Sequence, residues 1–280
     1  MDKIAIISDI HGNLEALKSV LEDIRNRGID KIYCIGDIIF KGVHSSECLK
    51  LVRENCQVIL QGNCDDYFTK EHDLSKIDSE VEKTRIKWGQ EIITDEERDY
   101  LQSLPLTYEF YMSGRLVRIF HANPEDQYRA VAGINSTIVT RRQMFLPSEK
   151  TESQKKADVV VFGHIHTQLL NKEYNRTLIN CGSVGNAVDY IRNDDIDGNV
   201  LETTNADYLI IEGELGSTQY GKPINFQFVR VPYDIEKELS SDIFNPEKES
   251  YGVELTTGKY RDMYKVYDAL KKEGLNVDDI

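Results

Sequence analysis

Apolar residues near the start of the chain change from an uninterrupted run to a helical repeat. Lys3–Ser8 is a short apolar run, which is typical of a buried strand. A helix-like spacing follows, with Asn13 as a candidate N-cap and Gly28 as a stop signal. The apolar positions of this predicted helix are Leu14, Leu17, Val20, Leu21 and Ile24.

The next thirty or so residues continue this alternation of elements. Lys31–Ile35 is predicted to be a second strand, Ser45–Glu54 a second helix and Gln57–Leu60 a third strand. Strand–helix–strand order of this kind favours parallel β-α-β units. We therefore expect an α/β fold that begins with a parallel sheet.

Residues 66–104 are mostly polar and helical in pattern. Thr94-Asp95-Glu96-Glu97 has the form of a capping box, and the helix that it opens should end near Leu104-Pro105. We interpret this stretch as a helical insertion or cap. Leu106–Met112 and Arg115–Phe120 then predict a hairpin that turns at Ser113-Gly114.

The second half of the chain contains further predicted strands, while 124–156 has no clear pattern. These strands are Asp158–Phe162, Thr177–Asn180, Asp207–Glu212 and Asn225–Val231. Residues 233–280 are predicted to be a charged, largely helical C-terminal extension. The expected fold class is a single α/β domain over 1–280, a four-layer α-β-β-α sandwich of two stacked mixed sheets with a helical insertion.

Composition narrows the class of protein. With 280 residues, of which 40% are hydrophobic, the chain can bury a sizeable core. Its apolar runs all fall short of the ~18 residues of a membrane span, and its start does not resemble a signal peptide. The five cysteines are odd in number and form no C-x-x-C pair, which suits a reducing compartment. We expect a soluble, cytoplasmic protein that does not act at a membrane.

The charge balance disfavours one class of partner. A net charge of −14 makes the chain a poor binder of nucleic-acid backbones. The negative charge does not exclude a small phosphorylated substrate, because some of the carboxylates can be metal ligands and a bound dication inverts the local field.

Three polar motifs follow the first three predicted strands. They are Ser8-Asp9-Ile10-His11-Gly12-Asn13, Gly36-Asp37 and Gly62-Asn63-Cys64-Asp65-Asp66. In open α/β sheets the carboxyl ends of the strands form the ligand crevice. Each motif taken singly can also be explained as a helix cap or a turn. Three in sequence at one sheet edge favour a shared site.

Histidines repeat this placement later in the chain. His121 follows Arg118-Ile119-Phe120, and Gly163-His164-Ile165-His166 follows a run of apolar residues. Four of the six histidines therefore lie in loops directly after predicted strands. Histidine and carboxylate ligands together suit Mn²⁺, Fe and Zn²⁺ better than a calcium site built of oxygens alone.

The order D-x-H, G-D, G-N-x-D, H, G-H-x-H resembles the signature of the calcineurin-like metallophosphoesterases, over about the first 190 residues. Connecting segments resemble the bacterial small-phosphoesterase branch, including Leu14-Glu15-Ala16-Leu17, 91–105 and Cys181-Gly182-Ser183-Val184-Gly185. The resemblance implies a metal-dependent phosphoesterase.

The resemblance also implies a ligand set for two divalent ions, with Mn²⁺ preferred and Fe, Zn²⁺, Ni²⁺ or Mg²⁺ as alternatives. One ion would be held by Asp9, His11, Asp37 and His166. The other would be held by Asp37, Asn63, His121 and His164, so that Asp37 bridges the two. The predicted reaction is in-line attack of a metal-bridging hydroxide on a phosphodiester or phosphomonoester.

Asp37, Asn63, Cys64 and Asp65 are the predicted catalytic residues. Many members of the family carry His where this chain has Cys64, and that His is thought to protonate the leaving group or bind phosphate. A thiol is a weaker proton donor than an imidazolium, so we expect esters with good leaving groups to be the better substrates. Alternatively, Cys64 only fills space behind Asn63.

Two other functions stay open on the same motifs. The retromer subunit with this fold works as a non-catalytic scaffold and also lacks the motif His, but all seven ligand positions here are chemically competent. A nuclease is disfavoured by the acidity. The natural substrate, the metal and the oligomeric state are not determined at this level, and an oligomer is compatible with the sequence.

Overall fold

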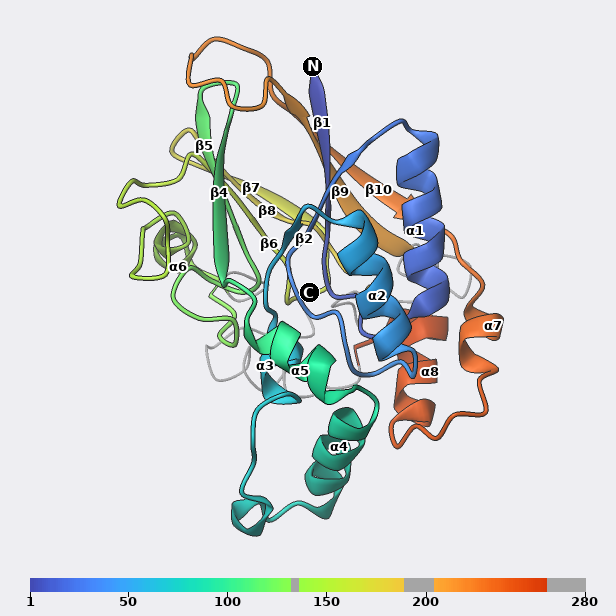
Figure 1. The fold of residues 1–280 in the computed structure, drawn as a ribbon. Helices are drawn as coiled ribbons and strands as arrows, with labels where there is room; N and C mark the ends of the chain where they lie inside the picture. The colour runs from blue at the N-terminus through green and yellow to red at the C-terminus, as the bar shows by residue number, and fades with distance from the viewer. Residues whose placement is uncertain (132–135, 189–203, 261–280) are drawn as a thin grey trace, which may run out of the picture.

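Two stacked five-stranded sheets form the centre of the molecule (Figure 1). The computed structural model describes residues 1–131, 136–188 and 204–260. The strand order is β10-β9-β1-β2-β3 in the first sheet and β4-β5-β6-β8-β7 in the second. Each sheet contains parallel and antiparallel pairs, so the predicted stack of two mixed sheets is confirmed.

The first sheet starts from the predicted β-α-β units. Its members are β1 (Asp2–Ile7), β2 (Lys31–Cys34), β3 (Val58–Ile59), β9 (Ala206–Gly213) and β10 (Asn225–Val231). The first three pair in parallel, β9 runs antiparallel to β1, and β10 runs antiparallel to β9. Since β1, β2 and β3 run in one direction, their carboxyl ends lie at the same sheet edge.

The second sheet has a parallel centre with antiparallel edges. Its members are β4 (Thr107–Met112), β5 (Arg115–Phe120), β6 (Val159–Phe162), β7 (Leu169–Glu173) and β8 (Arg176–Asn180). β5, β6 and β8 pair in parallel, whereas β4 and β7 pair antiparallel to their neighbours. The predicted hairpin is present, with positive φ angles at Ser113 and Gly114 in its turn.

Helices cover the outer faces and extend one end (Figure 1). They are α1 (Leu14–Asn26), α2 (Ser45–Asn55), α3 (Asn63–Tyr67), the 3₁₀ turn η1 (Leu74–Lys76), α4 (Glu80–Glu91), α5 (Asp95–Gln102), α6 (Ile138–Gln143), α7 (Ile235–Leu239) and α8 (Lys248–Thr257). Asn13 caps α1 by accepting from the Ala16 N–H, as predicted. None of the described helices is long and apolar enough to cross a membrane.

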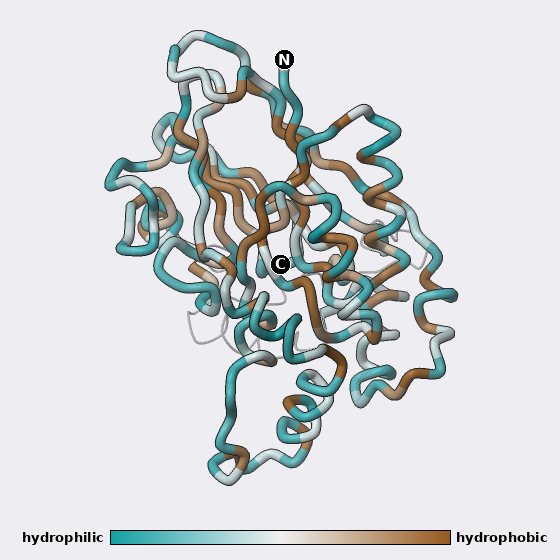
Figure 2. Tube along the Cα trace, in the orientation of Figure 1, coloured by the Kyte–Doolittle hydropathy of each residue, from teal (hydrophilic) through white to brown (hydrophobic). Residues whose placement is uncertain are grey.

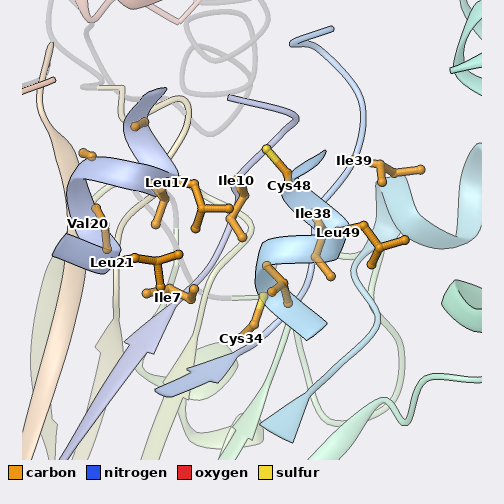
Figure 3. Packing of buried hydrophobic residues seen from close by; sticks show 14 of the residues in the cluster. Ile7, Ile10, Leu17, Val20, Leu21, Cys34, Ile38, Ile39, Cys48 and Leu49 are labelled. Atoms are coloured by element: carbon orange, nitrogen blue, oxygen red, sulfur yellow. The ribbon is translucent and has the colours of Figure 1, made fainter. Parts of the chain in front are cut away.

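The alternation along β1 shows how the layers are built. Ile4 and Ile6 pack between the two sheets, while Ala5 and Ile7 face α1 and α2. Figure 3 shows Leu17 and Leu21 of α1 directed toward Ile7 and its neighbours. Figure 2 shows hydrophobic residues gathered along the strands and polar ones along loops and outer helix faces.

The outer face of the second sheet has its own apolar cover. Val160 and Phe162 of β6 pack with Met144 and Phe145, which directly follow α6. The segment that the sequence left unassigned thus provides the fourth layer. Residues 132–135 within it lie outside the described residues.

The helical insertion is attached to the main core through aromatic side chains. Phe40 stacks on Phe68 with ring centroids 3.6 Å apart, and Trp88 of α4 meets the edge of Phe40 at 5.3 Å. The indole of Trp88 donates to the Phe244 carbonyl oxygen at 2.8 Å. The insertion therefore packs on both the core and the C-terminal segment, of which 261–280 are outside the described residues.

One strand was missed. β7 alternates between half-buried and exposed positions and forms the edge of its sheet, paired only with β8 among the described strands. Its sequence, Leu169-Leu170-Asn171-Lys172-Glu173, lacks the apolar run or β-branched residues that indicate a strand. β7 and β8 form a hairpin whose two turn residues, Tyr174 and Asn175, have positive φ angles.

Candidate metal centre

The seven predicted ligands meet at one end of the sheet stack. Asp9 and His11 follow β1, Asp37 follows β2, and Asn63 follows β3. From the second sheet, the ligands are His121 directly after β5 and the pair His164 and His166 after β6. Two sheet edges with the same polarity thus face each other across the site.

The backbone at this site is strained. Five of the seven predicted ligands have positive φ angles, between 52° and 68°: Asp9, His11, Asp37, His164 and His166. The left-handed region is costly for residues other than glycine and persists only where surrounding contacts hold it. Such strain commonly accompanies functional sites, and here it directs several side chains toward one point.

Backbone hydrogen bonds supply the holding contacts. The N–H of Asp9 donates to the Gly36 carbonyl at 3.0 Å, and the N–H of His11 donates to the Asp37 carbonyl at 3.0 Å. Glycine is needed where the second and third loops touch. A Cβ on Gly36 would lie 2.4 Å from the nitrogen of Gly62, and one on Gly62 would lie 2.1 Å from the nitrogen of Asp37.

A first cluster forms around Asp9, His11 and His166. The Nε2 atoms of His11 and His166 lie 3.1 Å apart, and His166 Nε2 lies 3.2 Å from Asp9 Oδ1. Asp9 Oδ1 is buried and has no hydrogen-bond partner, while Asp37 Oδ2 lies 3.6 Å from His11 Nε2. Two ring nitrogens and two carboxylate oxygens that converge in this way fit a bound cation.

A second cluster surrounds the side-chain oxygen of Asn63. This oxygen lies 3.0 Å from His121 Nε2 and 2.7 Å from His164 Nδ1. Asp37 Oδ2 lies 3.4 Å from His121 Nε2. When both ring nitrogens are unprotonated, as they must be to bind a cation, the amide oxygen faces only lone pairs, and hydrogen bonding alone would then require the amide to be rotated. A cation satisfies the arrangement as it stands, and Asp37 belongs to both clusters.

Two of the imidazoles are oriented by carbonyl groups behind them. His121 Nδ1 donates to the Ile35 carbonyl at 3.0 Å, and His166 Nδ1 donates to the Asn186 carbonyl at 2.7 Å. With Nδ1 protonated, each ring presents the lone pair of Nε2 to the cluster. This is the arrangement expected of metal-ligating histidines.

The charges within the site keep its carboxylates ionised. Burial would raise the pKa of Asp37, but the charge of His121 and its hydrogen bond lower it below its usual value, as His166 and His121 do for Asp9. Burial would lower the pKa of His121, and Asp37 with Asp9 raises it to about 9. A cation that binds His121 must therefore displace a proton, so its affinity should rise with pH.

The pKa values of His164 and His11 are lowered, in contrast to that of His121. Burial, followed by the charge of His121, lowers the pKa of His164 to about 4. Burial, followed by the charge of Lys41, lowers the pKa of His11 well below its usual value. Both rings are therefore neutral at pH 7 and available as ligands.

Asp65, predicted to be catalytic, supports the loops instead of facing the cavity. Its carboxylate accepts from the backbone N–H groups of four residues, at 2.8 to 3.3 Å: Asp37, Ile38, Ile39 and Gly62. Burial and the charge of Asp37 raise its pKa to about 7, whereas the N–H donors act to lower it. Asp65 thus ties the loops after β2 and β3 together.

A cavity of about 150 Å³ opens onto the clusters. It is lined by His11, Asp37, Lys41, Asn63, Cys64, His164, His166, Val188 and Tyr260. The sulfur of Cys64 lies within 4.8 Å of ligand atoms of His11 and Asp37. Cys64 therefore borders the site. Burial, followed by the charge of Asp37, raises the pKa of its thiol well above the usual value.

Sequence reasoning missed three of the lining residues: Lys41, Val188 and Tyr260. Lys41 lies only four positions after Asp37, in the same strand-to-helix loop, so its charge was a usable signal. Tyr260 comes from beyond α8, far from every motif. No local pattern connects it with the site.

Comparison with known proteins identifies the family. The profile of the calcineurin-like phosphoesterase superfamily domain matches residues 2–202. The uncharacterized protein MJ0912 of Methanocaldococcus jannaschii is 32% identical over 277 residues, covering 91% of this chain and 98% of that protein.

Solved structures share the fold. A metallophosphoesterase from Sphaerobacter thermophilus superposes with a TM-score of 0.66 at 23% identity, covering 92% of this chain and 99% of that one. The hypothetical protein PH1004 from Pyrococcus horikoshii superposes with a TM-score of 0.65 at 16% identity, covering 99% and 96%. Together with the family match, these findings show that the chain belongs to the calcineurin-like phosphoesterase superfamily.

Proposed function

We propose that this chain is a phosphoesterase that requires two divalent cations and hydrolyses phosphodiester or phosphomonoester bonds by in-line attack of water on phosphorus. The observation that carries this proposal is the pair of lone-pair clusters that share Asp37. Family membership supports the reaction class.

The donor set fits divalent cations of intermediate hardness. Imidazole nitrogens, carboxylates and one amide oxygen accept Mn²⁺, Fe, Zn²⁺ and similar ions, and we propose Mn²⁺ as the preferred ion. When bound, a pair of such ions supplies Lewis-acid activation of water and neutralises charge on the phosphoryl group.

The chain's own residues would contribute position and charge. Asp9 and Asp37 supply the negative charge that holds cations, and Asp37 can serve both clusters. Asn63 adds an oxygen ligand without a further negative charge near an incoming phosphate. His121 and His166 are held in place by carbonyl oxygens, so little reorganisation is needed on binding.

Cys64 suggests a preference among substrates. Its thiol borders the cavity where a leaving group could sit, and its own surroundings favour the neutral form. A bound cation acts in the opposite direction. A neutral thiol is a weaker proton donor than an imidazolium, and a thiolate has no proton to donate. We therefore propose that phosphodiesters of acidic alcohols or nucleotide-type anhydrides are the better substrates.

The acidity of the chain supports a small phosphorylated substrate over a nucleic acid, and the five unpaired cysteines support a cytoplasmic location. Both are part of the same proposal.

The decisive experiment loads the protein with Mn²⁺ and measures hydrolysis of an aryl phosphodiester together with metal content. We expect turnover that a chelator abolishes and added Mn²⁺ restores, with about two ions bound per chain. Two bound ions without turnover on any monoester, diester or nucleotide would instead favour a metal-binding scaffold.

A further inference from the structure

Lys41 places a positive charge in the wall of the cavity. Among the described residues that line the cavity, it alone carries an ammonium group. The other side chains there are ligands, the thiol of Cys64, and the side chains of Val188 and Tyr260. An anion that enters the cavity therefore meets the ammonium group of Lys41 in the cavity wall.

The backbone at Lys41 is held in a strained conformation. Phe40 and Lys41 are consecutive residues with φ angles of 74° and 67°, although neither is glycine. Phe40 is anchored in the core by its stacking on Phe68. The side chain of Asn245 donates to the Lys41 carbonyl oxygen at 2.7 Å. Two adjacent left-handed residues persist only where such contacts hold them.

The ammonium group is also held from two sides. Its nitrogen lies 3.3 Å from the side-chain oxygen of Asn186 and 3.7 Å from a carboxylate oxygen of Glu254 in α8. The Lys41 side chain is 14% exposed and that of Glu254 is fully buried. Asn186 is the residue whose carbonyl orients His166. The charge of Lys41 thus lies beside the first ligand cluster, where water screens it little.

We propose that Lys41 is a substrate-binding residue whose ammonium binds an oxygen of the phosphoryl group, and that Asn186 and Glu254 position it. The inference rests on the proposed phosphoesterase function and names the part of the chain that recognises the anion. Through Glu254, the proposal makes α8 part of the active site. This helix lies in the C-terminal segment, beyond residues 2–202 that the family profile matches.

The geometry suits this role for a physical reason. Asp9 and Asp37 place negative charge beneath the cavity. Where bound cations do not fully neutralise this charge, it repels an approaching phosphate anion. Lysine offers three N–H donors on a flexible stem, so Lys41 can exchange its 3.3 and 3.7 Å contacts for a shorter one to the substrate.

The test measures binding of inorganic phosphate to the Mn²⁺-loaded protein by titration calorimetry. Lys41→Met keeps the length of the side chain and removes its charge. We expect its dissociation constant for phosphate to rise roughly tenfold or more, the loss of one charged hydrogen bond. Lys41→Arg should stay within about threefold of the parent because it keeps the charge.

Three controls separate this effect from folding and metal loss. Lys50→Met removes a charge from an exposed lysine on α2 and should leave phosphate binding unchanged. Metal content and the thermal unfolding temperature should match the parent in all variants. In turnover assays Lys41→Met should raise KM more than it lowers kcat.

Several outcomes would overturn the proposal. They are an unchanged phosphate affinity in Lys41→Met, no phosphate binding by the parent, or a loss of affinity that follows a loss of bound metal. Absence of turnover in the parent would count against the phosphoesterase function. The phosphate affinities of the parent and Lys41→Met would still test the role of Lys41 in binding.

Discussion

The two sheets contribute different chemistry to the candidate metal centre. Loops of the first sheet provide every oxygen donor, from Asp9, Asp37 and Asn63, together with one imidazole. Loops of the second sheet provide only imidazoles, from His121, His164 and His166. In the proposed site, the first sheet would therefore supply the negative charge that attracts cations, and the second sheet would complete the coordination with imidazole nitrogens.

The two halves are also held differently. The loops of the first sheet bond to each other through their backbones, and Asp65 ties two of them together. The histidines of the second sheet reach across to the first, where His121 bonds to the Ile35 carbonyl and the His164 N–H donates to Asp9 at 3.0 Å. The loops of the first sheet thus form a framework to which the histidines of the second sheet attach.

The largest expected effect comes from the residue that serves both clusters. Asp37→Asn removes a shared negative charge and should lower kcat/KM roughly a thousandfold or more, which corresponds to several kcal/mol of transition-state stabilisation. His164→Gln removes a donor from one cluster only and should cost about a hundredfold. Metal analysis should show both ions reduced in the first variant and one retained in the second.

The opposite ranking would break the comparison. If His164→Gln lost both ions while Asp37→Asn kept two, the second sheet would be the framework. Circular dichroism should confirm that both variants fold.

A smaller effect is expected on stability from Asp65. Asp65→Ala leaves four backbone N–H groups without their acceptor and should lower the free energy of unfolding by about 2–4 kcal/mol. Asp66→Ala is the matched control. Its carboxylate pairs with Lys70 near the surface, and its loss should cost less than about 1 kcal/mol. Urea unfolding of both variants measures the difference, and equal losses would show that the loops do not depend on Asp65.

The smallest effect concerns the leaving group. Cys64→His should raise the rate on alkyl esters relative to aryl esters by about tenfold, because an imidazolium protonates a poor leaving group better than a thiol does. Steady-state rates on one alkyl and one aryl phosphodiester test this. An unchanged alkyl-to-aryl ratio would remove the basis for linking Cys64 to substrate preference.

Much of the candidate site could be predicted because its signals are local. Each ligand follows a strand that an apolar run reveals, and the order of the motifs matches the family to which the chain belongs. The structure brings all seven predicted ligands together at one end of the sheets. For Asp65 it shows contacts with backbone N–H groups and none with the cavity, which the sequence did not indicate.

By itself, the sequence determined the strand and helix periodicities and the capping of α1 and α5. These follow from interactions among near neighbours in the chain. The predicted ligand set came from the order of the motifs, which resembles that of the family. Only the tertiary structure decided the left-handed backbone at five of the ligands, the pairing of edge strand β7 and the meeting of Lys41 with Glu254. Such features depend on contacts between residues far apart in sequence, and no local pattern records which distant segment will supply the contact that holds them.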